Sequence, residues 1–215
     1  MNRPLLRNLI LPLLAIWQLA AAAAPAQTTH ARPFEAEIPA FETMDRSNPP
    51  PHGAILFTGS SSIRKWTTLA QDFKGHTVIN RGFGGSQISD VVYYTDRIVI
   101  PYQPQRIVLF AGSNDLDAGK TAEQVFDDFK VFVQKVRGAL PRVEIDYISI
   151  TTSLLRWHEV EQVKKANGLI SSWIIAQHHL TFINVFPATL GEDSRPKPRL
   201  FLADRLHMNA QGYAI

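Results

Sequence analysis

The sequence predicts an α/β fold in which helices cover both faces of a five-stranded parallel sheet, a three-layer α/β/α arrangement. Five short runs of β-branched, aliphatic or aromatic residues have the character of strands: residues 54–57, 77–80, 106–111, 144–150 and 181–186. Each gap between them is long enough to hold a helix, which is typical of a parallel sheet with right-handed crossovers. The length of 215 residues suits one such domain with a sizeable core.

Residues 1–26 have the three-part pattern of a secretory signal peptide. Arg3 and Arg7 precede an apolar run at residues 9–24, and Ala24-Pro25-Ala26 forms an A-x-A cleavage site. A membrane anchor is the alternative, but a run of roughly 16 residues that contains proline and glutamine is shorter than a spanning helix. We therefore expect an exported protein, periplasmic or secreted, with no stable membrane insertion after the signal is removed.

Composition excludes several function classes. Two of the 22 basic residues lie in the signal, which leaves 20 against 19 acidic residues in the mature chain. No basic surface for nucleic acid is expected from that balance. The complete lack of cysteine excludes disulfides, thiolate catalysis and cysteine metal sites.

Residues 27–53 are rich in proline and precede the first predicted strand. We expect them to form an extended arm on the surface of the domain formed by residues 54–215, with Phe34, Ile38 and Phe41 in grooves.

Two helices carry strong signals. Thr121 and Gln124 form a capping box, and an apolar stripe follows until Pro141 ends the helix. A second stripe predicts a helix over residues 159–178, and residues 209–213 indicate the start of a last one. Both stripes are expected to face the core.

Four segments at or beyond strand ends hold small or polar residues that packing alone would not select. They are Gly59-Ser60-Ser61-Ser62, Asn80-Arg81-Gly82-Phe83-Gly84-Gly85, Gly112-Ser113-Asn114-Asp115 and Asp204-Arg205-Leu206-His207. Because the carboxyl ends of parallel strands share one edge of the sheet, we expect these segments to lie together. Asn80, Asp115 and Asn167 are expected to brace loops rather than to touch substrate.

Ser61 is the candidate nucleophile, since it follows a strand and a glycine turn. A serine hydroxyl needs a base, and an imidazole base needs a carboxylate that fixes its tautomer. His207 and Asp204 can supply both from one loop. The Ser61 amide, the Gly85 amide and the Asn114 side chain are candidate donors to an oxyanion.

In this order the four segments resemble the sequence blocks of the SGNH hydrolase superfamily, the GDSL-like lipases and acylhydrolases. The resemblance covers residues 54–213 and implies a flavodoxin-like fold. It implies that Ser61 is the nucleophile, that Gly85 and Asn114 donate to the oxyanion, and that Asp204 and His207 are the acid and base.

The same resemblance implies ester hydrolysis through an acyl-enzyme, without a metal or organic cofactor. The substrate would be a small-molecule or carbohydrate ester, and the short gaps between the blocks favour an acetyl or other short acyl group. One position departs from the family pattern: Ser60 stands where the family usually has aspartate. Because Ser60 is not a triad position, we expect activity to persist, with neither Ser60 nor Ser62 as nucleophile.

Two other functions stay open at this stage. One is a catalytically inactive carbohydrate- or envelope-binding protein on the same fold. The other is a phosphodiester or nucleotide hydrolase, which would need a metal site or a phosphate loop. The sequence has no G-x-x-x-x-G-K motif and no clustered carboxylates, and its remaining six histidines have no spacing suited to a metal.

Overall fold

A computed structural model of the chain describes residues 34–215. The signal peptide predicted at residues 1–26 lies outside the described residues, as does the first part of the predicted arm. Both remain predictions. Within the part of the chain that the structure describes, no helix is long and apolar enough to cross a membrane.

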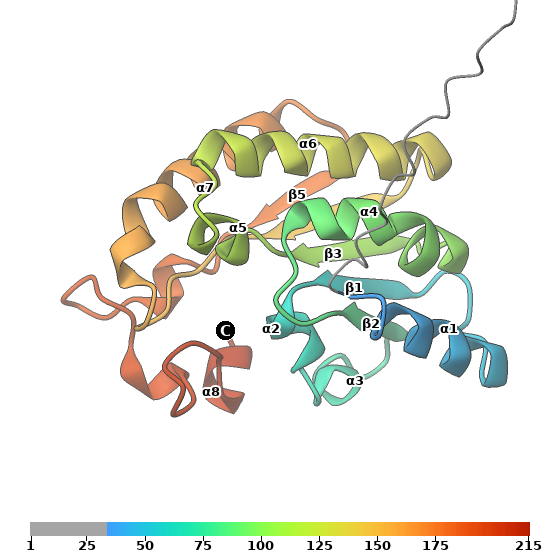
Figure 1. Ribbon diagram of the computed structural model, residues 1–215, viewed down its shortest axis with the longest axis horizontal. Helices are drawn as coiled ribbons and strands as arrows, with labels where there is room; N and C mark the ends of the chain where they lie inside the picture. Colours follow the sequence, from blue (N-terminus) through green and yellow to red (C-terminus); the bar gives the residue numbers. More distant parts are fainter. Residues whose placement is uncertain (1–33) are drawn as a thin grey trace, which may run out of the picture. The chain divides into compact units, whose positions relative to one another are not determined.

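The centre of the domain is a sheet of five parallel strands (Figure 1). They are β1 (Ile55–Gly59), β2 (Val78–Gly82), β3 (Arg106–Phe110), β4 (Glu144–Ile148) and β5 (Leu180–Ile183). Their order is β2-β1-β3-β4-β5, the flavodoxin-like order, and all four pairings are parallel. The predicted fold class is confirmed.

Successive residues of the central strands point to opposite faces, and both faces are buried. Leu56 and Ile107 belong to the larger core, whereas Phe57 and Val108 belong to a smaller core on the other face. This accounts for the nearly continuous apolar runs in the sequence, since a parallel sheet is covered on both sides.

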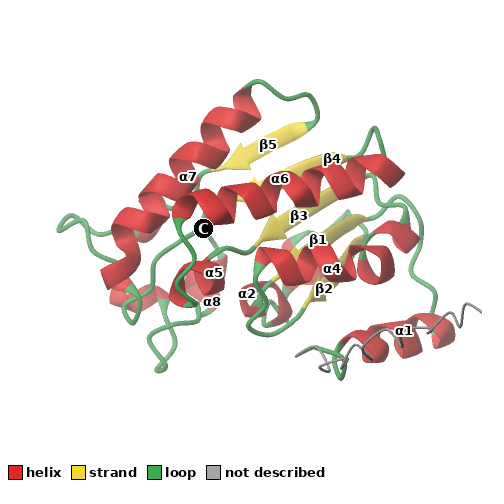
Figure 2. Cartoon of the chain, turned by 45° about the horizontal axis from the view of Figure 1, so that its top comes forward, coloured by secondary structure: helices red, strands yellow, loops and turns green. Residues whose placement is uncertain are grey.

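The helices divide unequally between the two faces (Figures 1 and 2). The larger core is covered by α1 (Ile38–Ser47), α4 (Ile88–Ile98), α6 (Ala122–Ala139) and α7 (Val160–Ile175). The smaller core is covered by α2 (Ser61–Arg64) and α3 (Leu69–Asp72). Two further short helices, α5 (Ser113–Asp117) and α8 (Ala210–Tyr213), lie in the loops at the carboxyl edge of the sheet. The 3-10 turns are η1 (Ile100–Tyr102), η2 (Trp157–Glu159), η3 (Pro187–Thr189) and η4 (Pro198–Leu200).

The predicted capping box is present at the start of α6. Gln124 N donates to Thr121 Oγ1 at 3.3 Å, and Thr121 N donates to Gln124 Oε1 at 2.8 Å. The next predicted helix ends at Ile175, earlier than the expected residue 178, with Ala176 as its C-cap. The chain then turns into β5 through His179, which has a φ of 57°.

Three predicted strands also end early: β3 ends at Phe110, β4 at Ile148 and β5 at Ile183. Ser149 Oγ, directly after β4, accepts the amides of Val185 and Phe186 at 3.0 Å each. These side-chain bonds replace the ladder at the end of β5, so the strand stops at Ile183 rather than at residue 186.

The extended conformation predicted for the proline-rich arm is wrong for residues 38–47, which form α1. Pro39 lies in the first turn, where a missing amide hydrogen costs nothing. The expected burial of apolar side chains in the arm is confirmed: Phe34 and Ile38 are buried, and Phe41 packs against the larger core.

Charged side chains fasten α1 and the residues before it to the rest of the domain. Arg81 bonds to Asp45 and stacks between Phe41 and Tyr102, with its guanidinium carbon 5.0 and 4.7 Å from the two ring centroids. Arg97 and Arg64 form further ion pairs with glutamates of this segment. The segment is therefore an integral part of the folded domain.

Candidate active site

The site lies at the carboxyl edge of the sheet, where the strand order reverses between β1 and β3. Ser61 begins α2 after β1, and Asn114 lies in α5 after β3. Gly59 has a φ of 126°, and a Cβ there would lie 2.0 Å from Phe110 O. Only glycine fits so close to the neighbouring strand, which explains the residue at the start of the serine segment.

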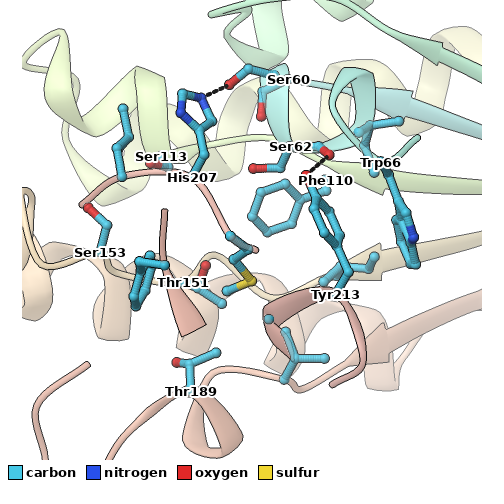
Figure 3. A pocket seen from close by; sticks show the side chains of 18 of the residues that line it. Ser60, Ser62, Trp66, Phe110, Ser113, Thr151, Ser153, Thr189, His207 and Tyr213 are labelled. Atoms are coloured by element: carbon cyan, nitrogen blue, oxygen red, sulfur yellow. Dashed lines mark hydrogen bonds between the residues drawn. The ribbon is translucent and has the colours of Figure 1, made fainter. Parts of the chain in front are cut away.

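The structure brings Ser61 and His207 into contact, although they lie in the early and late parts of the sequence. Ser61 Oγ lies 3.0 Å from His207 Nε2, the contact drawn as a dashed line from His207 in Figure 3. The His207 side chain is 16% exposed, so the imidazole is shielded from most of the solvent. This is hydrogen-bond distance for proton transfer from the hydroxyl to the ring.

Asp204 fixes the other side of the imidazole. Its Oδ2 lies 2.7 Å from His207 Nδ1, and its Oδ1 accepts the amides of Leu206 and His207 at 3.0 and 2.9 Å. These bonds from His207 and Leu206 hold the pKa of the Asp204 carboxyl well below its usual range. The carboxylate only accepts, so Nδ1 carries the hydrogen and Nε2 is free to accept from Ser61.

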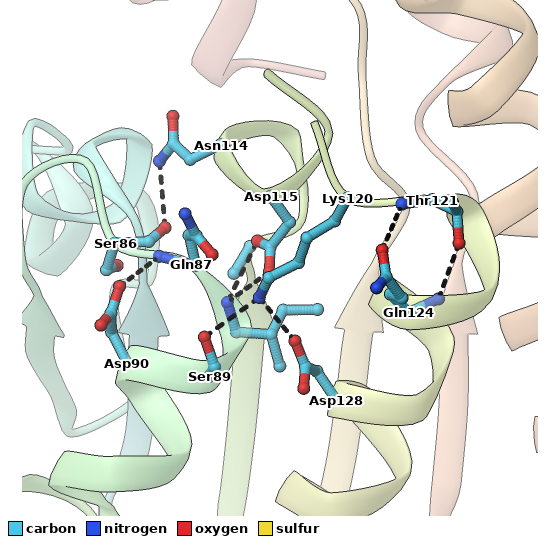
Figure 4. Close-up of polar contacts among 12 residues, drawn as sticks. Ser86, Gln87, Ser89, Asp90, Asn114, Asp115, Lys120, Thr121, Gln124 and Asp128 are labelled. Carbon is cyan, nitrogen blue, oxygen red and sulfur yellow. Dashed lines mark hydrogen bonds and ion pairs between the residues drawn. The ribbon is translucent and has the colours of Figure 1, made fainter. Parts of the chain in front are cut away.

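Asn114 is oriented by bonds to both ends of its amide. Its Nδ2 donates to Ser86 O at 3.0 Å (Figure 4), and its Oδ1 accepts from Arg156 Nη1 at 2.9 Å. A primary amide has two N–H groups, so one hydrogen on Nδ2 is left for a further acceptor.

Ser61 and Gly85, the two predicted backbone donors, differ in position: Ser61 lines the cavity described below, whereas Gly85 is not among the residues that line it. Ser61 is the first residue of α2, and the first amides of a helix have no partner within the helix. Gly85 is exposed, with a φ of 75° and open space where a Cβ would stand.

The neighbouring serines are held in other ways. Ser60 is 5% exposed and donates its amide to Phe110 O at 2.9 Å, while Ser62 O accepts from the Tyr213 hydroxyl at 2.8 Å (Figure 3). Burial raises the pKa of Tyr213 to about 12, so its hydroxyl stays a donor. Ser60 is the N-cap residue of α2, but its side chain makes no capping hydrogen bond. Backbone contacts therefore hold this position, at which the resembling family usually has aspartate.

A cavity of about 120 Å³ opens beside Ser61 and His207. Its wall is largely apolar and includes Phe110, Ile148, Val185, Phe201 and Met208.

The sequence matches the model of the GDSL-like Lipase/Acylhydrolase family over residues 49–215. The chain belongs to this family. The match covers most of the chain and all four polar segments, which confirms the resemblance and identifies an ester-hydrolysing enzyme. No functionally curated protein matches the sequence significantly.

Solved structures with the fold of this GDSL-like hydrolase include two bacterial proteins and one fungal protein. A GDSL-like lipase from Bacteroides thetaiotaomicron has a TM-score of 0.69 at 19% identity, covering 83% of this chain and 92% of that chain. A member of the lipolytic G-D-S-L family from Veillonella parvula has a TM-score of 0.60 at 19% identity, with coverages of 75% and 92%. A carbohydrate esterase family 3 protein from Talaromyces cellulolyticus has a TM-score of 0.59 at 16% identity, with coverages of 74% and 90%.

The residues predicted to brace the loops of this GDSL-like hydrolase do so. Asn80 donates to Ile63 O at 2.6 Å and accepts from Gly82 N at 2.9 Å, which ties β2 to α2. Asn167 accepts from Ile150 N at 2.9 Å and donates to Ile150 O at 2.8 Å. Both side chains bond to backbone groups at or beyond strand ends.

Asp115 braces the loop after β3 from a fully buried position (Figure 4). Its carboxylate accepts from Ile88 N at 3.1 and 3.2 Å and from Lys120 Nζ at 2.9 Å. Burial raises the pKa of Asp115, and the Lys120 ammonium partly offsets that effect. Lys120 in turn reaches Asp128 and Ser89 at 2.7 and 3.1 Å, so one ammonium joins α4, α5 and α6.

Two residues near the site were not predicted from the sequence. Lys65 Nζ lies 3.3 Å from His207 Nδ1, next to the Asp204 end of the ring. An ammonium and a protonated Nδ1 are both hydrogen-bond donors. The two nitrogen atoms are therefore close to each other without forming a hydrogen bond. Arg156, which lines the cavity, follows the polar segment Thr151-Thr152-Ser153 beyond β4, and that location at a strand end is the signal that could have found it.

The described residues contain no group of three or more histidines, aspartates and glutamates that could hold a metal ion. The organised polar groups near the cavity are hydroxyl, imidazole, carboxylate and amide, the set used for acyl transfer.

Proposed function

We propose that this GDSL-like hydrolase is a serine esterase that cleaves short-acyl esters, with Ser61 as nucleophile, His207 as base and Asp204 as the acid that orients it. The continuous hydrogen-bond chain from Ser61 Oγ through the His207 ring to the Asp204 carboxylate carries the proposal. It fixes the imidazole in the tautomer that can accept the serine proton.

The reaction begins when His207 Nε2 removes the proton from Ser61 Oγ as the oxygen attacks the ester carbonyl carbon. The carbonyl oxygen takes the negative charge, and the donors Ser61 N–H, Gly85 N–H and Asn114 Nδ2–H stabilise it. The C–O bond to the alcohol then breaks, and the alcohol leaves with the proton from His207. Water, deprotonated by His207, attacks the acyl-enzyme and releases the acid while Ser61 regains its proton.

The size of the cavity supports an acetyl or other short acyl group. At about 120 Å³ it is smaller than the roughly 300 Å³ or more of pockets for drug-sized ligands, so a long acyl chain would extend beyond it. The alcohol part is a small molecule or a carbohydrate in this proposal, and the fold shared with a carbohydrate esterase is consistent with the second.

We propose further that the enzyme is exported to the periplasm or secreted. The basic, apolar and A-x-A sections of residues 1–26 support export with cleavage after Ala26. Expression of the full chain in a bacterial host followed by N-terminal sequencing of the exported product tests this. A product that begins at Gln27 is expected, and a product in the periplasm or medium that still begins at Met1 would overturn the cleavage.

Three serine variants test the mechanism against a short-chain nitrophenyl ester. Ser61→Ala is expected to lower kcat by roughly 10³-fold or more, because the covalent step is lost. Ser60→Ala and Ser62→Ala are matched controls on the same turn, and each is expected to keep most turnover.

Mass spectrometry of the quenched reaction should find the acyl group on Ser61 in wild type. Ser61→Ala with turnover near that of wild type would refute the nucleophile. A folded wild type without Ser61-dependent ester release would favour the catalytically inactive binding protein instead.

A further inference from the structure

The guanidinium of Arg156 makes all its side-chain hydrogen bonds to residues of α5. Nη1 donates to Ser113 Oγ and to Asn114 Oδ1, both at 2.9 Å, and Nη2 donates to Asp117 Oδ2 at 2.6 Å. The side chain is 13% exposed and lines the cavity beside Ser61. Shielding from solvent strengthens such charge-assisted bonds, and the planar fork fixes their directions.

A guanidinium can only donate hydrogen bonds, so the end of the Asn114 amide that contacts it must be the oxygen. Oδ1 must face Arg156, and Nδ2 then faces Ser86 O at 3.0 Å. With one end held by a charge-assisted bond and the other by a carbonyl, the amide plane is fixed, and so is the direction of its remaining N–H group.

Arg156 is itself held by the loop after β4. Its amide donates to Ser153 Oγ at 3.1 Å, and the preceding amide, that of Leu155, donates to Arg205 O at 3.1 Å. Arg205 lies between Asp204 and His207, so the same loop contacts both the segment that carries Asn114 and the segment that carries the base. The oxyanion donor and the base therefore share one support.

We propose that Arg156 is a positioning residue that aims the Asn114 amide at the oxyanion, a role that rests on the proposed function of Asn114. The alternative for a cavity arginine is recognition of an anionic substrate. Asp117 already neutralises the charge of Arg156, and three of the five N–H groups of the guanidinium already donate to α5. Loss of Arg156 should therefore lower kcat and leave KM for a neutral ester nearly unchanged.

The test is a double-mutant cycle with 4-nitrophenyl acetate as substrate. Asn114→Ala is expected to lower kcat by about 10²- to 10³-fold, the effect of removing one oxyanion donor. Arg156→Ala is expected to lower kcat by at least about 10-fold and by less than Asn114→Ala, since a mispositioned donor retains part of its effect. In the Asn114→Ala background, Arg156→Ala should cost less than about 2-fold, because residues that act as a unit are not additive.

Two further variants keep the test decisive. Arg156→Lys retains the charge without the fork and is expected to restore only part of kcat, and it replaces Arg156→Ala in the cycle if the alanine variant does not fold. Arg97→Ala is the control, because Arg97 is also held in ion pairs, with Glu35 and Glu42, but lies on α4 away from the cavity. Its kcat should equal that of wild type.

Each deviation has a separate meaning. Wild-type kcat in folded Arg156→Ala, or an equal loss in both backgrounds, would overturn the positioning role while leaving the triad proposal intact. A raised KM with unchanged kcat would identify substrate binding instead and would also overturn it. Wild-type kcat in Asn114→Ala would refute the oxyanion role in the proposed function, and the inference would fall with it.

Discussion

His207 Nε2 lies 3.0 Å from Ser61 Oγ, although 146 positions separate the two residues along the chain. A compact hairpin holds the histidine there. Phe201 and Met208 form an antiparallel bridge, and Leu202 N donates to His207 O at 2.8 Å. The proposed base is thus fixed by backbone bonds before substrate arrives, which is the preorganisation that proton transfer requires.

Replacing Asp204 with asparagine should leave the fold intact and lower kcat by about 10³- to 10⁴-fold. The asparagine amide can donate to Nδ1 and so favours the wrong imidazole tautomer, in which Nε2 carries the hydrogen and cannot accept from Ser61. Steady-state kinetics on an acetyl ester measures the loss. Asp127→Asn, a change at an exposed acid on α6, is the control and should keep wild-type kcat. Equal turnover of the two variants would contradict the role of Asp204.

The bonds to Asp204 also predict how stability depends on pH. The pKa of its carboxyl is lowered in the folded state, chiefly by the amide and imidazole of His207. A lowered folded pKa gives stability that is complete above the unfolded pKa, about 4, and that is lost as the pH falls toward the folded value.

The free energy of unfolding of wild type should therefore exceed that of Asp204→Asn at every pH from 7 down to about 5. The excess should shrink below about pH 4. Urea denaturation of both proteins at a series of pH values measures it. A difference that stays constant to pH 2.5 would show that Asp204 does not contribute through its ionised form.

The cavity predicts a preference for short acyl groups. Acetyl and butyryl nitrophenyl esters should have kcat/KM at least about 10-fold above that of the dodecanoyl ester, because a chain too long for the cavity displaces the ester carbonyl from Ser61 Oγ, and a misplacement of about 1 Å can cost about 10²-fold in rate. Phe201→Ala removes a buried ring from this wall and should shift the optimum toward longer chains. Val131→Ala, at an exposed site on α6, should leave the profile unchanged. A wild-type optimum at the dodecanoyl ester would contradict the short-acyl proposal.

Much of the fold could be predicted because its determinants are local. The apolar runs and their spacing identified the five strands, and Thr121 with Gln124 identified the start of α6. The site residues were found by the rule that parallel strands end at one edge, together with the family resemblance. Ser61, His207, Asp204 and Asn114 all lie at the predicted edge.

Other features depend on contacts that no local pattern contains. The proline-rich segment forms α1 because its apolar and acidic side chains meet partners on β2 and α4, which the segment alone cannot reveal. Arg156 was missed because its significance lies in three acceptors about 40 positions away in sequence. Ser60, the departure from the family pattern, is accommodated by its amide bond to Phe110 O, which any residue type could make.

Replacement of Asp45 on α1 tests whether the described residues before position 49, which lie outside the family match, stabilise the domain. Its carboxylate accepts bonds from Arg81 and from the Tyr102 hydroxyl, and the Arg81 side chain is only 9% exposed. Asp45→Ala leaves that guanidinium without its counter-charge, so the free energy of unfolding should fall by about 2–3 kcal/mol, somewhat less than for a fully buried pair.

Asp96→Ala is the matched control, since Asp96 is 65% exposed and pairs with Lys135 at 2.7 Å. It should change stability by less than about 0.5 kcal/mol. Urea denaturation at pH 7 compares the two, and kcat at 25 °C should match wild type in both because neither residue lies at the cavity. If Asp45→Ala unfolds at the same urea concentration as Asp96→Ala, the ion pair between Asp45 and Arg81 contributes no stability, and the apolar contacts of Phe34 and Ile38 and the ion pairs of the neighbouring glutamates hold α1 in place.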